Sequence, residues 1–150
     1  MSEPLMSVAG QLIGIPAEKY SGTNGVTVDQ NNKTIGLDET VLFETSTDTS
    51  TATLSENISA FRYADFHITD DNGGVGFIRI PTEYGKYKAG CYLPSLSSPD
   101  VRFAYIISSN GINWSADGAQ KVGNSWMTIG SGPIRIKKVI GVNRISGGNA

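Results

Sequence analysis

Short runs of alternating apolar and polar residues dominate the chain from residue 40 onward, and clusters of Gly, Asn, Asp, Ser and Pro separate them. Side chains of a β-strand point alternately to the two faces of a sheet, so a period of two predicts strands with one buried face. Several short strands divided by turn clusters are typical of a sandwich. We therefore predict an all-β fold, an antiparallel and jelly-roll-like β-sandwich, over residues 40–145.

The clearest alternation lies in residues 101–117, VRFAYIISSNGINWSAD. Two alternating runs flank Asn110-Gly111, which is the strongest short-range signal for a β-hairpin with a two-residue turn. Such a turn would pair Ile107 with Trp114. The face predicted to be buried carries Val101, Phe103, Tyr105, Ile107, Ile112, Trp114 and Ala116. The face predicted to meet solvent or a partner carries Arg102, Ala104, Ile106, Ser108, Asn113 and Ser115.

A second hairpin is predicted around the turn cluster DDNGG at residues 70–74. A three-residue loop over residues 72–74 would place Gly74 in the left-handed region, where glycine carries no side-chain penalty. That loop would pair Ile68 with Ile78, and His67 would face Arg79 on the polar side. The residues that it would place on the buried face are Ala64, Phe66, Ile68, Ile78 and Ile80.

Other segments are predicted with less regular patterns. Residues 45–53 form either a loop or a solvent-facing strand, residues 81–88 form a break with exposed tyrosines, and residues 89–96 form a strand. In the last strand, 134–145, Lys138 interrupts the apolar alternation. Either a β-bulge shifts the register there or the lysine stem lies along the surface. The basic run 135–138 is interpreted as a solvated strand face.

The N-terminal 39 residues differ in pattern from the sandwich segment. Residues 22–39 predict a hairpin, with Val26 and Val28 on one strand, a turn at 30–33, and Ile35 and Leu37 on the other. Two such short strands are marginal when isolated, and identical copies around a threefold axis would stabilise them. The apolar patch within residues 1–20 is either a frayed terminus or an assembly contact. We predict a trimerisation segment at 1–39, a tip domain at 40–145 and a disordered tail at 146–150.

Composition excludes several classes of function. The chain has 12 basic and 14 acidic residues, so no strong field would attract nucleic acid or an anionic membrane. A single cysteine, Cys91, excludes an internal disulfide and a multi-cysteine metal site, and it is interpreted as a small core residue. No apolar run approaches the roughly 20 residues of a membrane span, and no signal peptide is recognised.

The sequence offers little catalytic chemistry. His67 is the one histidine, and Asp65 and Thr69 share its strand face. A carboxylate beside an imidazole suits a metal or general-base site, but alternation alone places these residues together, and we favour a surface role. The run at 70–73 resembles a calcium loop but lacks its spaced ligands, so a turn is the better interpretation. We predict no catalytic residue, no metal and no cofactor.

Carbohydrate binding remains by elimination. Sugar recognition uses aromatic faces for stacking and short polar side chains for hydroxyl groups, both displayed on a rigid scaffold. The alternative for each aromatic residue is ordinary packing. The candidate binding residues are Tyr84, Tyr87, Tyr92 and Trp126, with Asn110, Asn124 and Asp117 as polar partners.

Three segments carry a resemblance to a known family. Residues 22–40 (GTNGVTVDQNNKTIGLDET) resemble the passages that join a fibre shaft to its tip, residues 41–66 (VLFETSTDTSTATLSENISAFRYADF) resemble a first sandwich hairpin of such tips, and residues 134–142 (IRIKKVIGV) resemble their last strand. The chain thus resembles the C-terminal tip of a bacteriophage tail or neck fibre or a related adhesin. It is short for a full-length fibre, so it is either a fragment or a very small fibre.

The resemblance implies a function and partners without fixing receptor residues. It implies a homotrimer located in the virion, a β-sandwich tip, attachment to a host-surface glycan or protein receptor, and contact with other virion proteins through the N-terminal segment. Two alternatives stay open. One is a structural collar or decoration protein that binds no receptor, and the other is a polysaccharide depolymerase tip.

Overall fold

A computed structural model describes residues 26–29, 34–83, 86–94 and 101–145 of the chain, with side chains from residue 38 onward. Within these residues the secondary structure is almost entirely strand, with one short 3-10 helix. The elements are β1 (Val26–Asp29), β2 (Thr34–Leu37), β3 (Glu39–Glu44), β4 (Thr51–Thr53), η3 (Ile58–Ala60), β5 (Phe61–Asp70), β6 (Val75–Pro81), β7 (Tyr87–Pro94), β8 (Val101–Ser108), β9 (Asn113–Val122), β10 (Ser125–Thr128) and β11 (Ile134–Arg144).

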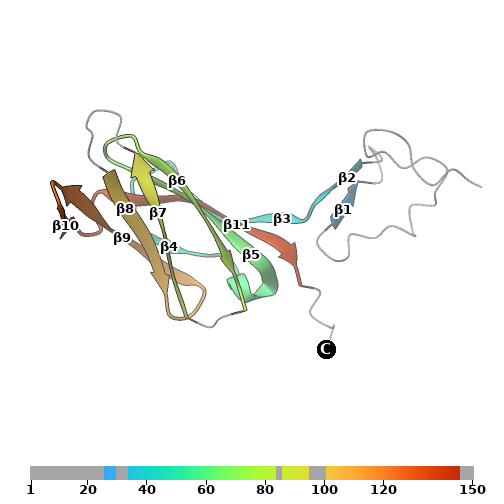
Figure 1. Ribbon diagram of the computed structural model, residues 1–150. Helices are drawn as coiled ribbons and strands as arrows, with labels where there is room; N and C mark the ends of the chain where they lie inside the picture. Colours follow the sequence, from blue (N-terminus) through green and yellow to red (C-terminus); the bar gives the residue numbers. More distant parts are fainter. Residues whose placement is uncertain (1–25, 30–33, 84–85, 95–100, 146–150) are drawn as a thin grey trace, which may run out of the picture.

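Two antiparallel sheets pack face to face (Figure 1). The first has the strand order β3-β11-β5-β6, and the second has the order β10-β9-β8-β7, with β4 also paired to β9. Early strands thus pair with late strands in both sheets, β3 with β11 and β4 with β9, whereas β5–β6 and β7–β8–β9 are sequential hairpins. The predicted all-β sandwich is confirmed, and the pairing of early with late strands gives it a jelly-roll-like wrapping.

The predicted N-terminal hairpin is present. β1 and β2 pair antiparallel, with Val26 opposite Leu37 and Val28 opposite Ile35, and they form a separate two-stranded sheet. The predicted turn at 30–33, the apolar patch within 1–20 and the tail at 146–150 lie outside the described residues.

Aromatic rings from both sheets meet in the core. Phe66 of β5 and Trp114 of β9 lie 4.4 Å apart between ring centroids, and Tyr87 stacks on Trp114 at 5.5 Å. Trp114 is therefore a core residue, as predicted. The largest side chains that are fully buried are Phe61, Phe66, Ile58, Ile68, Leu93, Ile106, Ile134, Ile136 and Val139.

The predicted register of the 101–117 hairpin is wrong by one residue. β8 and β9 pair Ile106 with Ala116 and Ile107 with Ser115, so a longer loop replaces the two-residue turn. The Asn110 side-chain carbonyl accepts hydrogen bonds from the Ile112 and Asn113 amides, and Gly111 takes a positive φ of 75°. Because one residue of shift reverses the faces of a strand, the face of β8 predicted to meet solvent is buried. Its residues are Arg102, Ala104, Ile106 and Ser108.

The hairpin between β5 and β6 differs from its prediction in position but not in loop length. The amide of Asp70 donates to the Gly74 carbonyl, so residues 71–73 form the three-residue loop. Gly73, not Gly74, has the positive φ, at 77°. Moving a loop of the same length by one residue shifts the register by two, so the predicted buried face is kept. Phe66 then pairs with Ile78, and His67 with Phe77 instead of Arg79.

Three other predictions are corrected or completed. Residues 81–88 do not form a break with exposed tyrosines throughout, because β7 begins at Tyr87, which is buried. In β11 the register against β5 shifts between Ile136 and Lys138, which confirms the bulge. Residues 45–53 were predicted as either a loop or a strand, and both are present. Residues 45–50 form a loop, and residues 51–53 form the short strand β4, whose Ala52 is buried.

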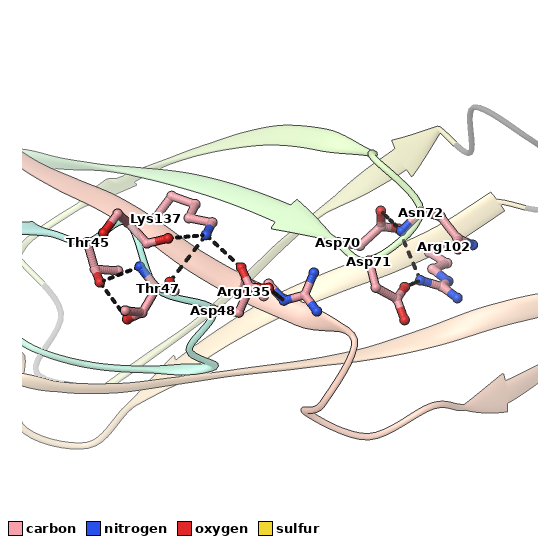
Figure 2. Close-up of polar contacts among 10 residues, drawn as sticks. Thr45, Thr47, Asp48, Asp70, Asp71, Asn72, Arg102, Arg135 and Lys137 are labelled. Atoms are coloured by element: carbon pink, nitrogen blue, oxygen red, sulfur yellow. Dashed lines mark hydrogen bonds and ion pairs between the residues drawn. The ribbon is translucent and has the colours of Figure 1, made fainter.

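Ion pairs join segments that are distant in sequence (Figure 2). Asp48 contacts Lys137 at 2.7 Å and Arg135 at 3.3 Å, so the basic run is paired at the surface of β11. Hydrogen bonding to Lys137 lowers the pKa of the Asp48 carboxyl. At another position of the sandwich the buried Arg102 contacts Asp70 at 3.3 Å and also contacts Asp71.

A bidentate ion pair gives the fold a pH dependence. Arg144 donates to both Glu56 carboxylate oxygens, at 2.7 and 2.8 Å, and these hydrogen bonds lower the pKa of the Glu56 carboxyl from its ordinary value. A carboxyl whose pKa is lower in the folded than in the unfolded state stabilises the fold at pH values above the unfolded-state pKa. This stabilisation is lost as the pH falls through the folded-state pKa.

Glu56→Gln should reduce the free energy of unfolding by up to about 1 kcal/mol at pH 7, since the pair is partly exposed. At pH 2–3 the variant and the parent should converge, as measured by urea unfolding at both pH values. An equal difference at both would contradict this.

Candidate functional site

A row of aromatic side chains lies on the outer face of the β7–β10 sheet. With the observed register, Phe103 and Tyr105 of β8 point away from the core, and Tyr92 of β7 pairs with Phe103. The ring centroids follow one another at 6.2 Å from Trp126 to Tyr92, 5.2 Å from Tyr92 to Phe103, and 6.3 Å from Phe103 to Tyr105. We call these four residues the aromatic platform.

The platform is accessible in the single chain. Tyr92 is 63% exposed and Trp126 is 47% exposed, while Phe103 and Tyr105 are partly buried beneath their neighbours. Although β8 and β9 lie between β7 and β10, the rings of Tyr92 and Trp126 approach each other across them. The exposed rings of Tyr92 and Trp126 provide a surface on which a flat apolar ligand face can stack, and Phe103 and Tyr105 support them.

Charged side chains border the row at Tyr105. The Lys88 ammonium lies 4.7 Å from the centre of the Tyr105 ring, a cation–π contact. Burial raises the pKa of the Tyr105 hydroxyl, and a hydrogen bond with the Asp117 carboxylate raises it further. The Tyr105 hydroxyl therefore stays protonated at neutral pH, and Lys88 and Asp117 provide a donor and an acceptor beside the rings.

A glycine allows the rings to lie close to the sheet. A Cβ atom at Gly90 would lie 2.5 Å from the Phe103 ring and 2.6 Å from the carbonyl oxygen of Ala104. Gly90→Ala should therefore destabilise the fold by about 1–3 kcal/mol and displace the Phe103 ring. Chemical denaturation measures this, with Gly132→Ala as the control, because a Cβ there meets nothing within 4 Å. Equal stability of the two variants would contradict the observed packing of Phe103.

Three of the seven predicted binding residues come together here. Tyr92 and Trp126 form the exposed part of the platform, and Asp117 lies at its border. Asn124 lies in the turn between β9 and β10 and is exposed.

The other predicted residues serve elsewhere or are not described. Tyr87 is wrongly predicted as a surface residue: it is buried, and its hydroxyl donates to the Thr82 carbonyl at 2.6 Å. Asn110 shapes the β8–β9 loop through hydrogen bonds to backbone amides. Tyr84 lies outside the described residues.

Sequence reasoning missed Phe103, Tyr105 and Lys88 as site residues. The two aromatic residues were predicted to face the core because the loop length was predicted one residue too short. The polar sequence SSNGIN held a signal for the longer loop, since Ser and Asn side chains replace backbone hydrogen bonds in turns. Ser108 Oγ indeed accepts from the Gly111 amide at 2.9 Å.

Among the described residues, no group of three or more His, Cys, Asp and Glu side chains could hold a metal ion. His67 is partly exposed and packs edge-on against Phe77 at 5.4 Å. Both candidate calcium-loop aspartates, Asp70 and Asp71, contact Arg102. Cys91 packs against the core, and burial raises the pKa of its thiol.

Within the described part of the chain, no helix is long and apolar enough to cross a membrane.

The sequence matches no protein-family model, and comparisons with curated proteins and with solved structures also found no match.

Proposed function

We propose that the protein is a non-enzymatic carbohydrate-binding tip of a phage tail or neck fibre, which attaches the virion to a host-surface polysaccharide. The observation that carries this proposal is the aromatic platform. Pyranose rings present flat faces of C–H groups, and the exposed rings of Tyr92 and Trp126, 6.2 Å apart between centroids, offer stacking surfaces for them. Lys88 and Asp117 are placed to bond hydroxyl groups at the edge of such a ligand.

Multivalency would convert weak sites into firm attachment. A shallow, open surface binds one chain weakly, and copies joined in one particle gain avidity without new contacts. A homotrimer assembled through the N-terminal segment would provide those copies, and the separate β1–β2 hairpin supports this arrangement because two short strands are marginal alone.

A structural role in a collar or decoration is the second candidate. Exposed apolar side chains also lie on the opposite sheet, where Phe77 is 53% exposed and Val75 is 69% exposed. Such patches are typical of surfaces that other copies or other virion proteins cover. In that case the aromatic platform would be buried between subunits.

Two measurements on the full chain separate these candidates. Light scattering should give the mass of a trimer, and an array of bacterial surface polysaccharides should give binding to a defined group of glycans. Stable trimers that bind no glycan and no host cell would favour the structural role. Release of reducing ends from a bound polysaccharide would instead identify a depolymerase.

A further inference from the structure

A shallow groove lies on the same outer face as the aromatic platform. Its volume is about 340 Å³, and its lining includes Thr51, Thr53, Ile107, Ser109, Asn113 and Ser115. These side chains come from β4, β8, β9 and the β8–β9 loop. We call this feature the hydroxyl groove.

The groove continues directly from the platform. Ile107 lies two residues beyond Tyr105 on the same face of β8, and Ser115 pairs with Ile107 as Asp117 pairs with Tyr105. The four residue-to-residue steps from Phe103 to Ile107 span about 13 Å of strand. An elongated ligand lying along β8 would therefore pass from the aromatic rings into the groove.

The chemistry of the lining differs from that of the platform. The hydroxyl groups and the Asn113 amide lie beside three apolar side chains, Ala52, Ile107 and Trp114, and none of the lining residues is charged. Thr53 Oγ1 donates to Asn113 Oδ1 at 3.1 Å, which fixes the amide and leaves its NH₂ group as a donor. Short side chains of this kind exchange hydrogen bonds with sugar hydroxyls, whereas an acidic sugar would meet no cation inside the groove.

We propose that the hydroxyl groove is a polar subsite for an uncharged sugar, and that the ligand is a linear oligosaccharide spanning both the platform and the groove. This inference rests on the proposed carbohydrate-binding function and adds the class of ligand. Stacking on the platform gives the first contacts. The groove then adds hydrogen bonds that only longer chains reach, so affinity should rise with chain length.

The test uses an array of linear oligosaccharides of two to eight sugars, in neutral and acidic series, with the full-length protein. The parent should prefer neutral chains and bind longer ones more tightly. The double variant Thr53→Val/Ser115→Ala should lose about tenfold in affinity for the longer chains, as expected for two lost hydrogen bonds, and nothing for disaccharides. Thr69→Val on β5 of the opposite sheet is the matched control and should bind like the parent.

Three results would overturn the inference. Unchanged binding of long chains by the double variant, while platform variants fail to bind, would remove the subsite and leave the proposed function standing. A preference for acidic chains would contradict an uncharged subsite. Absence of binding to every glycan would remove the proposed function and this inference together.

Discussion

Replacing Tyr92 and Trp126 together with alanine should weaken binding of the recognised polysaccharide by at least about 100-fold. These are the two most exposed rings of the platform, and truncating an aromatic anchor at a binding surface commonly costs more than about 1 kcal/mol. Two such losses, at about 1.4 kcal/mol each, correspond to a factor of about 100. Biolayer interferometry with the glycan identified on the array measures the change.

The control for this experiment lies on the opposite sheet. Phe77→Ala removes an aromatic ring of similar exposure, 53%, from the outer face of β6. It should leave glycan affinity unchanged, and the thermal unfolding of both variants should stay close to that of the parent. A similar loss of affinity in Phe77→Ala, or full binding by the platform variant, would place the binding surface elsewhere.

Arg102→Ala should cost about 3–5 kcal/mol of stability, the range for removing one partner of a buried ion pair. Arg102 lies on the buried face of β8 and contacts Asp70, whose side chain is fully buried. Asp70 also accepts hydrogen bonds from the Asn72 and Gly74 amides and so holds the β5–β6 loop. Removing the guanidinium leaves a buried carboxylate without its cation. Urea denaturation of the variant and the parent measures the loss.

Two further variants serve as comparisons. One breaks an exposed ion pair on β11, and the other removes both charges of the buried pair. Lys138→Ala breaks the exposed pair with Glu44, and it should change stability by no more than about 1 kcal/mol. The double variant Arg102→Met/Asp70→Asn removes both charges and should recover part of the loss. A stability close to that of the parent in Arg102→Ala would mean that the opposite face of β8 is the buried one.

The two central hairpins explain which parts of the fold could be predicted from sequence. Alternation identified both strand pairs, and in the β5–β6 hairpin an error of one residue in loop position left the buried face correct. In the β8–β9 hairpin the predicted loop was one residue too short, so the buried face was reversed. Apolar residues occupy both faces of β8, so hydrophobicity alone did not determine which face is buried. The side chains of Ser108 and Asn110 determine the buried face, because they accept hydrogen bonds from loop amides and so stabilise the longer turn.

The candidate site could be predicted only in part for the same reason. Tyr92, Trp126 and Asp117 were recognised as surface residues of suitable chemistry, whereas Phe103 and Tyr105 were assigned to the core with the reversed face. The approach of Trp126 to Tyr92 depends on rings leaning across two intervening strands, and residue spacing carries no information on this. Tyr87 was misassigned because β7 begins earlier than predicted and turns its ring onto Trp114.

The most direct test follows the two indole N–H signals of the protein in a ¹H–¹⁵N NMR titration with the recognised oligosaccharide. The chain has two tryptophans, Trp126 on the platform and Trp114 in the core, and each reports on its own environment. We expect the Trp126 indole signal to shift in proportion to saturation, and to shift more than the signal of Trp114, whose buried ring lines the floor of the hydroxyl groove. A Trp126 signal that stays unchanged at saturating ligand would contradict this expectation.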